Sequence, residues 1–263
     1  MDNVVVFDRA GQGEPLVLIH GVGHRRQAWS PVVPLLTPQR DVITVDLPGF
    51  GESAPHENGY GIESAVEMFG KLFVELGLDR PHVAGNSLGG LLSLALGEAG
   101  LVRSVTALSP AGLWTPRQQR YALSMLRTHR LLAERIPERT ARRLAATPAG
   151  RSMLTGMIVG RPDRLTTQAV LDDIRALACC PGFRPTLEQA RGGFRFDGVV
   201  KDVPVTIAWA RRDRILGRPK AAELRRIAPK AQLLVLPGCG HVPMNDEPEL
   251  VARVLLDGSS LAR

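Results

Sequence analysis

The chain has 263 residues, 44% of them hydrophobic, which is enough to bury the core of one sizeable domain. Its net charge is +7, but only 5% of its residues are aromatic and no basic segment is interleaved with aromatic residues, which argues against nucleic-acid binding. The three cysteines, two of them adjacent at Cys179 and Cys180, match neither a disulfide framework nor a metal-ligand spacing. The start lacks a basic segment, and no apolar stretch approaches about 18 residues. We therefore expect a cytoplasmic protein without membrane insertion.

Short apolar runs alternate with amphipathic runs along most of the chain. Strands are predicted at residues 4–7, 16–20, 42–46, 83–85, 102–108, 205–210 and 233–236. Helices are predicted between them at residues 25–36, 62–76, 87–99, 220–228 and 247–256. This alternation predicts an α/β fold with a mostly parallel, doubly wound sheet of about seven strands.

The alternation stops between residues 113 and 198. This stretch has helical periodicity instead, as at Ala122, Leu123 and Leu126, and prolines interrupt it at several points. We predict four or five short helices, inserted after the sixth strand as a cap over the strand ends, where open α/β sheets bind ligands. The core domain would then comprise residues 1–112 and 199–263, and the cap residues 113–198.

The predicted cap carries the excess positive charge. Residues 113–198 contain 15 arginines against 7 acidic residues, a net charge of +8. Such a surface could attract an acidic substrate, an acyl group on an anionic carrier or an anionic membrane. Arginine also outnumbers lysine 29 to 4 over the whole chain, a bias that GC-rich coding produces without any ligand.

A candidate nucleophile stands at Ser87, in the run Gly85-Asn86-Ser87-Leu88-Gly89. The run follows a predicted strand and precedes a predicted helix, which is the context of a nucleophile elbow. There, glycines allow a turn so tight that the central serine occupies its apex. A nucleophilic serine needs a base, a carboxylate that orients the base, and two donors for the oxyanion.

The expected base is His241, in a Gly- and Pro-rich loop after the predicted strand 233–236. The expected acid is Asp213, just beyond the strand 205–210. The alternative is a purely structural role, in which Asp213 forms an ion pair with a neighbouring arginine. The segment 108–112, which follows the preceding predicted strand, contains no carboxylate that could serve instead. In the same loop as His241, Cys239 is expected to be a small packing residue rather than a reactive thiol.

The oxyanion donors are expected from two backbone amides. Val22 lies in the glycine-containing loop after the strand 16–20, and Leu88 begins the helix after the elbow. His20 is expected to brace this loop rather than to take part in catalysis. His24, Trp114 and Met125 are the expected substrate contacts.

Five motifs in order give the chain a resemblance to the α/β-hydrolase superfamily. They are the loop at residues 20–23, the segment Asp46 to Ser53, Ser87 in its elbow, Asp213 and His241. The family usually begins with an extra antiparallel strand, for which this sequence leaves no room. The resemblance implies a cofactor-independent serine hydrolase without a metal, acting on a small-molecule ester.

Three functions are compatible with these residues. The first is a carboxylic-ester hydrolase that works through an acyl-enzyme. The second is a carbon–carbon bond hydrolase acting on vinylogous diketo acids, to which the elbow and the Arg-rich cap are similar. That family typically has a further Gly-Pro-Gly in the oxyanion loop, where this chain has Gly23-His24-Arg25. The third is a ligand-binding receptor that keeps this fold and triad with little turnover. An aspartate nucleophile, as in epoxide hydrolases, is disfavoured because the elbow carries serine.

Overall fold

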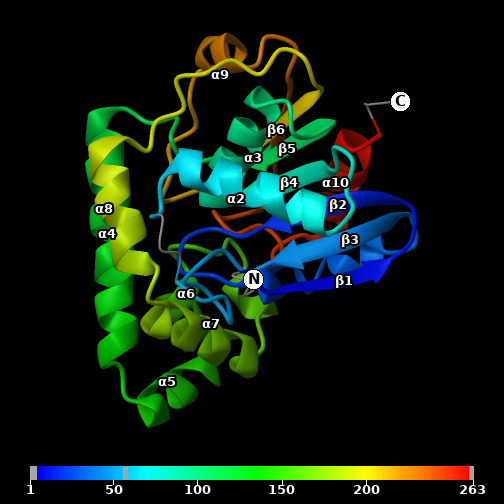
Figure 1. Cartoon of the computed structure of the whole chain (residues 1–263). Helices are drawn as coiled ribbons and strands as arrows, with labels where there is room; N and C mark the ends of the chain where they lie inside the picture. Colours follow the sequence, from blue (N-terminus) through cyan, green and yellow to red (C-terminus); the bar gives the residue numbers. More distant parts are fainter. Residues whose placement is uncertain (1–4, 56–58, 261–263) are drawn as a thin grey trace.

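A seven-stranded sheet forms the centre of the molecule in the computed structural model, which describes residues 5–55 and 59–260 (Figure 1). The strand order is β1-β3-β2-β4-β5-β6-β7, and every neighbouring pair is parallel except β1 and β3. The predicted α/β fold and mostly parallel sheet are confirmed. The strands are β1 (Phe7–Gly11), β2 (Glu14–Ile19), β3 (Arg40–Val45), β4 (His82–Asn86), β5 (Ser104–Leu108), β6 (Val205–Ala210) and β7 (Gln232–Leu236).

The first strand lies later in the chain than predicted. The prediction placed it at residues 4–7, of which Val4 lies outside the described residues, whereas β1 begins at Phe7 and pairs antiparallel with β3. The apolar run before Phe7 misled the prediction, because β1 is an exposed edge strand and carries little apolar signal. The chain turns at Gln12 and Gly13, with both Gly11 and Gly13 at positive φ.

Helices cover both faces of the sheet because side chains of a strand alternate between its faces. In β2, Val17 and Ile19 join one apolar cluster, and Leu16 and Leu18 join the other. The first cluster includes residues of α2 (Ile62–Glu75), α3 (Leu88–Glu98) and α9 (Ala221–Ile227). The second includes residues of α1 (Val33–Leu36) and α10 (Pro248–Gly258).

The helix predicted at residues 25–36 is broken in two. A 3-10 turn, η1 (Arg26–Trp29), precedes the single-turn helix α1. Pro31 explains the break, since proline lacks the N–H that a continuous helix requires and disfavours helical geometry in the residue before it.

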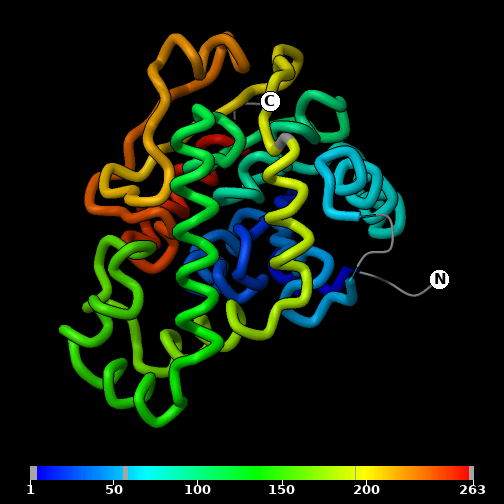
Figure 2. The backbone as a smooth tube through the Cα atoms, turned by 90° about the vertical axis from the view of Figure 1, so that its left-hand side faces the viewer, coloured from blue at the N-terminus to red at the C-terminus, as the bar shows by residue number. Residues whose placement is uncertain are grey.

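Five α-helices and one 3-10 turn separate β5 from β6 in the predicted cap region. Among the described residues, these helices follow the fifth strand, β5, and not a sixth as predicted. The helices are also less uniform than predicted, since α4 has 20 residues. The long helices α4 and α8 run side by side (Figures 1 and 2), and the Gln119 side chain donates to Ala190 O at 2.6 Å. The elements are α4 (Pro116–Arg135), α5 (Glu138–Ala145), α6 (Pro148–Thr155), η2 (Pro162–Arg164), α7 (Thr167–Cys179) and α8 (Phe183–Gly193).

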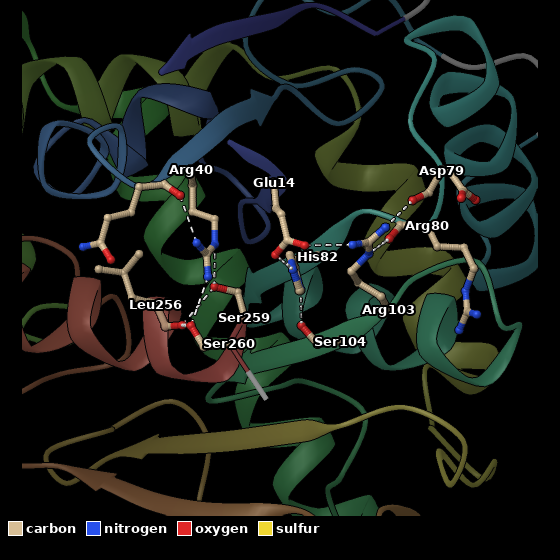
Figure 3. A network of polar contacts seen from close by, with 11 residues as sticks. Glu14, Arg40, Asp79, Arg80, His82, Arg103, Ser104, Leu256, Ser259 and Ser260 are labelled. Carbon is tan, nitrogen blue, oxygen red and sulfur yellow. Dashed lines mark hydrogen bonds and ion pairs between the residues drawn. The ribbon is translucent and has the colours of Figure 1, made fainter. Parts of the chain in front are cut away.

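A polar network joins the amino ends of β2, β4 and β5 (Figure 3). His82 at the start of β4 contacts Ser104 Oγ at 2.7 Å through Nδ1 and Glu14 Oε2 at 3.1 Å through Nε2. Arg103 adds an ion pair to the same Glu14 at 3.1 Å. These contacts tie together the amino ends of the strands. The loops described next lie at the opposite, carboxyl ends.

None of the helices within residues 5–55 and 59–260 is long and apolar enough to cross a membrane.

Candidate active site

The loops at the carboxyl ends of four parallel strands carry the predicted catalytic residues. Ser87 follows β4, Asp213 follows β6, and His241 follows β7, while Val22 lies in the loop after β2. Parallel strands place all these loops at one edge of the sheet, which is where ligands bind in open α/β folds. Ser87, Val22 and His241 line the same cavity at this edge, whereas Asp213 lies behind His241.

Ser87 occupies the strained turn that its motif predicts. Its backbone has φ 56° and ψ −113°, in the left-handed half of conformational space that non-glycine residues rarely adopt. Hydrogen bonds hold the turn in place: Ser87 N donates to Leu108 O at 3.0 Å, and Ser87 O accepts from Ala111 N at 2.9 Å. A Cβ on Gly89 would clash with the Ile19 carbonyl, so the motif needs glycine at this position for close packing.

His241 and Asp213 form a buried pair. His241 Nδ1 lies 2.8 Å from Asp213 Oδ2, and the two side chains are 7% and 2% exposed. The other oxygen, Asp213 Oδ1, accepts from the amides of Ile215 at 2.9 Å and Leu216 at 2.8 Å. Because Asp213 is acceptor-only when ionised, it selects the His241 tautomer with the proton on Nδ1 and leaves Nε2 as an acceptor.

The environment keeps Asp213 ionised. Burial alone would raise the pKa of its carboxyl, but the charge and hydrogen bond of His241 and the two backbone amides lower that pKa below its usual value. The carboxylate of Asp213 bonds to His241 and to these two amides rather than forming an ion pair with a neighbouring arginine.

His20 braces the loop that contains Val22, as predicted. Its Nε2 accepts from Leu47 N at 3.0 Å, which places the ring proton on Nδ1, and Nδ1 lies 2.7 Å from Gly21 O. His24 N also donates to Gly21 O, at 3.2 Å. The carbonyl of Gly21 and the N–H of Val22 belong to one trans peptide and point in opposite directions. These contacts therefore fix the direction of the Val22 N–H.

An ion cluster around the buried pair Arg26 and Asp46 holds the far end of the same loop. The Arg26 guanidinium contacts Asp46 at 2.5 Å, Asp8 at 2.8 Å and Glu52 at 2.9 Å. The Arg26 backbone N–H donates to the second Asp46 oxygen at 2.6 Å. The segment Asp46 to Ser53, one of the five motifs, thus positions the loop rather than lining the cavity.

The cavity has a volume of about 680 Å³ and lies between the strand ends and the helices that follow β5. All three residues predicted to contact substrate, His24, Trp114 and Met125, line it, as does Leu88. Most of its remaining wall is aliphatic and comes from α4, α6, α7 and α8. Such a lining favours a largely apolar ligand.

Sequence reasoning missed two residues that hold the His241 loop. Asn86 donates through Nδ2 to His241 O at 2.9 Å and so ties the elbow to the loop. Asp246, which is fully buried, accepts from the amides of Gly240 at 2.7 Å, Gly160 at 2.8 Å and Arg161 at 2.6 Å. The sequence gives no signal for these contacts. Those of Asn86 with His241 and of Asp246 with Gly160 and Arg161 join segments more than 80 residues apart, and that of Asp246 with Gly240 depends on the geometry of the loop.

Cys239 is a packing residue, as expected. Its side chain is fully buried, Sγ lies 3.6 Å from Pro237 O, and burial raises the pKa of the thiol to about 12. A thiol in that environment is not a nucleophile at neutral pH. In the described part of the chain, no group of three or more His, Cys, Asp or Glu side chains could hold a metal ion.

Comparison with known proteins agrees with this architecture. The model of the alpha/beta hydrolase family matches residues 16–254. A dihydrolipoyllysine-residue acetyltransferase component of an acetoin cleaving system from Pseudomonas putida is 32% identical over 95% of this chain, which spans 65% of that relative's length.

Two further relatives match over shorter regions. A 2-hydroxy-6-oxo-2,4-heptadienoate hydrolase from Pseudomonas putida is 45% identical over 32% of this chain and 32% of its own length. A pimeloyl-[acyl-carrier protein] methyl ester esterase from Legionella pneumophila is 40% identical over 34% of each chain. Because the family model covers most of the chain, the protein belongs to the alpha/beta hydrolase family.

Proposed function

We propose that this protein is a serine hydrolase that cleaves a carboxylic ester through an acyl-enzyme intermediate. The observation that carries the proposal is the position of Ser87, strained at the apex of its turn and lining one cavity with His241, whose ring is bonded to buried Asp213. Strained backbone is retained where function requires it, and the serine–histidine–carboxylate order is the arrangement that activates a hydroxyl group.

In the first step, His241 Nε2 removes the Ser87 proton while the Ser87 oxygen attacks the ester carbonyl. Asp213 stabilises the imidazolium that forms. The negative charge on the carbonyl oxygen is held by the amides of Val22 and Leu88. Leu88 begins α3, where the first N–H groups have no partner within the helix, and the Gly21 carbonyl contacts fix the direction of the Val22 N–H.

The tetrahedral intermediate collapses when His241 returns the proton to the leaving alkoxide, which departs as the alcohol. Water then attacks the acyl-Ser87 carbonyl, with His241 again as the base, and the acid is released as Ser87 regains its proton. Each step needs only residues of this chain. The esterase among the relatives supports an ester substrate.

Turnover of a nitrophenyl ester by the wild type and by Ser87→Ala tests the proposal. We expect Ser87→Ala to lower kcat by on the order of 10⁵ to 10⁶, as in other triads without their nucleophile. A folded Ser87→Ala protein that keeps more than about a tenth of the activity would contradict it.

A carbon–carbon bond hydrolase is the second candidate. The region of 45% identity to a 2-hydroxy-6-oxo-2,4-heptadienoate hydrolase favours it. A vinylogous diketo acid has a carboxylate and a conjugated enol system. The enol system absorbs light, so the change in absorbance follows the cleavage directly. If the wild type cleaves such an acid with a kcat/KM well above that for simple esters, this second function replaces the first.

A further inference from the structure

Several polar side chains lie in the mostly apolar wall of the cavity, and two of them, His24 and Asp173, interact electrostatically with each other. His24 comes from the loop after β2, and Asp173 comes from α7. Both line the cavity, and neither belongs to the proposed triad of Ser87, His241 and Asp213. Their place in the wall raises the question of which substrate group they contact.

The packing of α7 against the loop brings these two side chains together. A Cβ on Gly23 would lie 2.5 Å from Leu177 Cδ1, so this helix packs directly on the loop. Asp173 is four residues before Leu177 and therefore lies on the same helix face. At the edge of the contact, Arg25 Nη2 lies 3.8 Å from Asp172 Oδ2. Asp173 and His24 therefore line the cavity beside this helix–loop contact, close enough to interact electrostatically.

Within residues 5–55 and 59–260, the His24 ring and the Asp173 carboxyl form no hydrogen bond to another protein group, and both residues are partly exposed. Burial lowers the pKa of His24, so its ring is neutral near pH 7, with one N–H donor and one acceptor nitrogen. Burial raises the pKa of the Asp173 carboxyl, and the nearby positive charge of Arg25 opposes that rise. Because both side chains line the cavity and have hydrogen-bonding capacity to spare, a ligand in the cavity can form hydrogen bonds to them.

The chemistry of the pair favours a hydroxyl group. A hydroxyl donates one hydrogen bond and accepts another, as a carboxyl and a neutral imidazole together require. A ligand ammonium group would meet the charge of Arg25 beside Asp173, and a ligand carboxylate would meet Asp173 itself. Either ion would also have to leave water for a mostly aliphatic cavity, which is far more costly than for a hydroxyl.

We propose that His24 and Asp173 form a subsite that recognises a hydroxyl group of the substrate close to the scissile carbonyl. His24 is two residues from Val22, so their Cα atoms lie within about 7.6 Å of each other. The hydroxyl therefore belongs on the first few carbons of the acyl or alkoxy group. This subsite defines the substrate of the hydrolase proposed above and rests on that function for its role.

Binding to Ser87→Ala, measured by calorimetry, tests the subsite without turnover. Three ligands are compared. Methyl octanoate has no hydroxyl group, methyl 3-hydroxyoctanoate carries one on the acyl side, and 2-hydroxyethyl octanoate carries one on the alkoxy side. We expect one of the two hydroxy esters to bind about 5- to 10-fold more tightly than methyl octanoate, the gain of one well-made hydrogen bond.

Variants in the Ser87→Ala background assign the effect to Asp173. Asp173→Leu should abolish the preference for the hydroxyl, and Asp173→Asn should retain part of it, because its amide still forms hydrogen bonds. Asp172→Leu is the matched control: it removes the same charge from the adjacent residue, which does not line the cavity, and should leave the preference unchanged.

Equal binding of all three esters, or a preference that survives Asp173→Leu, would overturn the subsite. So would tighter binding of the corresponding 3-amino or 3-carboxy ester. Cleavage of methyl octanoate by the wild type separates the two proposals: cleavage without any hydroxyl preference refutes the subsite alone, and a hydroxyl preference without ester cleavage refutes the hydrolase alone.

Discussion

At Ser87 the chain is held in a backbone conformation that costs on the order of 1 to 3 kcal/mol for a non-glycine residue. The bonds to Leu108 and Ala111 and the close approach of Gly89 to β2 maintain it. The five-residue motif is only moderately specific, and its place between a predicted strand and a predicted helix is what pointed to this turn. The role of Ser87 as nucleophile stays a prediction.

Replacement of Asp213 tests its role in orienting the base. In Asp213→Asn an amide N–H can face His241 Nδ1 and stabilise the wrong tautomer, so we expect kcat to fall by about 10³ to 10⁴. Steady-state ester hydrolysis measures the loss. Asp257→Asn, which removes an exposed carboxylate on α10, is the control and should be silent. A nearly active Asp213→Asn protein would mean that another carboxylate orients His241.

His20 makes stability depend on pH in one direction. Burial lowers its pKa from 6.5 to about 4, so the folded state favours the neutral ring. The contribution is complete above the unfolded pKa near 6.5 and is lost as the pH falls toward 4. Between pH 7.5 and 4.5 this one group removes about 2.5 kcal/mol of unfolding free energy.

Denaturant unfolding of the wild type and His20→Asn at these two pH values isolates that contribution. The asparagine side chain cannot be protonated in this range, so the wild type should lose the larger amount on acidification, by about 2.5 kcal/mol. Equal losses in the two proteins would show that His20 is not buried in its neutral form.

Among the elements, the elbow shows how packing rather than local preference fixes the turn between β4 and α3. A Cβ on Gly89 would overlap the carbonyls of Ile19 and His20 in the neighbouring strand, although alanine is the better helix former. We expect Gly89→Ala to destabilise the protein by about 3 kcal/mol.

The control for Gly89→Ala is Gly192→Ala in α8, another helical glycine, where an added Cβ would meet nothing within 4 Å. It should be neutral or slightly stabilising. Thermal or denaturant unfolding compares the two variants. If both have the same effect, the packing of α3 on β2 is looser than described.

Elements with strong patterns were predictable, and elements governed by distant contacts were not. The buried strands β2, β3, β4 and β6 and the amphipathic helix α2 lie within about two residues of their predictions. The edge strand β1 was displaced because exposed strands carry little apolar signal, and the helix at residues 25–36 was overextended across Pro31. The lengths of α4 to α8 depend on packing between the helices, which a single sequence does not encode locally.

At the scale of the whole molecule, the motifs and the predicted parallel strands were enough to place the three predicted triad residues at one end of the sheet. Ser87, Asp213 and His241 lie on three loops at one edge because their strands are parallel. The residues that line the cavity were harder to predict from the sequence. Asp173 belongs to no motif, and its place in the wall depends on how α7 packs against the loop after β2.

The net charge of +8 on residues 113–198 gives a prediction about the electrostatic field of the molecule. Because the cavity wall is mostly aliphatic, we expect kcat/KM for a neutral ester to be nearly constant between about 0.05 and 0.5 M salt. A carboxylate-bearing ester of similar size should behave alike. Salt sensitivity confined to the anionic ester would instead show that these arginines steer an anionic substrate.

The most direct test of the account is to identify the residue that carries the acyl group during turnover. A nitrophenyl ester is mixed with enzyme, the reaction is quenched with acid within the first turnovers, and the protein is digested and mapped by mass spectrometry. The account predicts one acyl group on Ser87, absent when Ser87→Ala is treated in the same way. An adduct on another residue, or rapid turnover with no covalent adduct under conditions in which deacylation limits the rate, would contradict it.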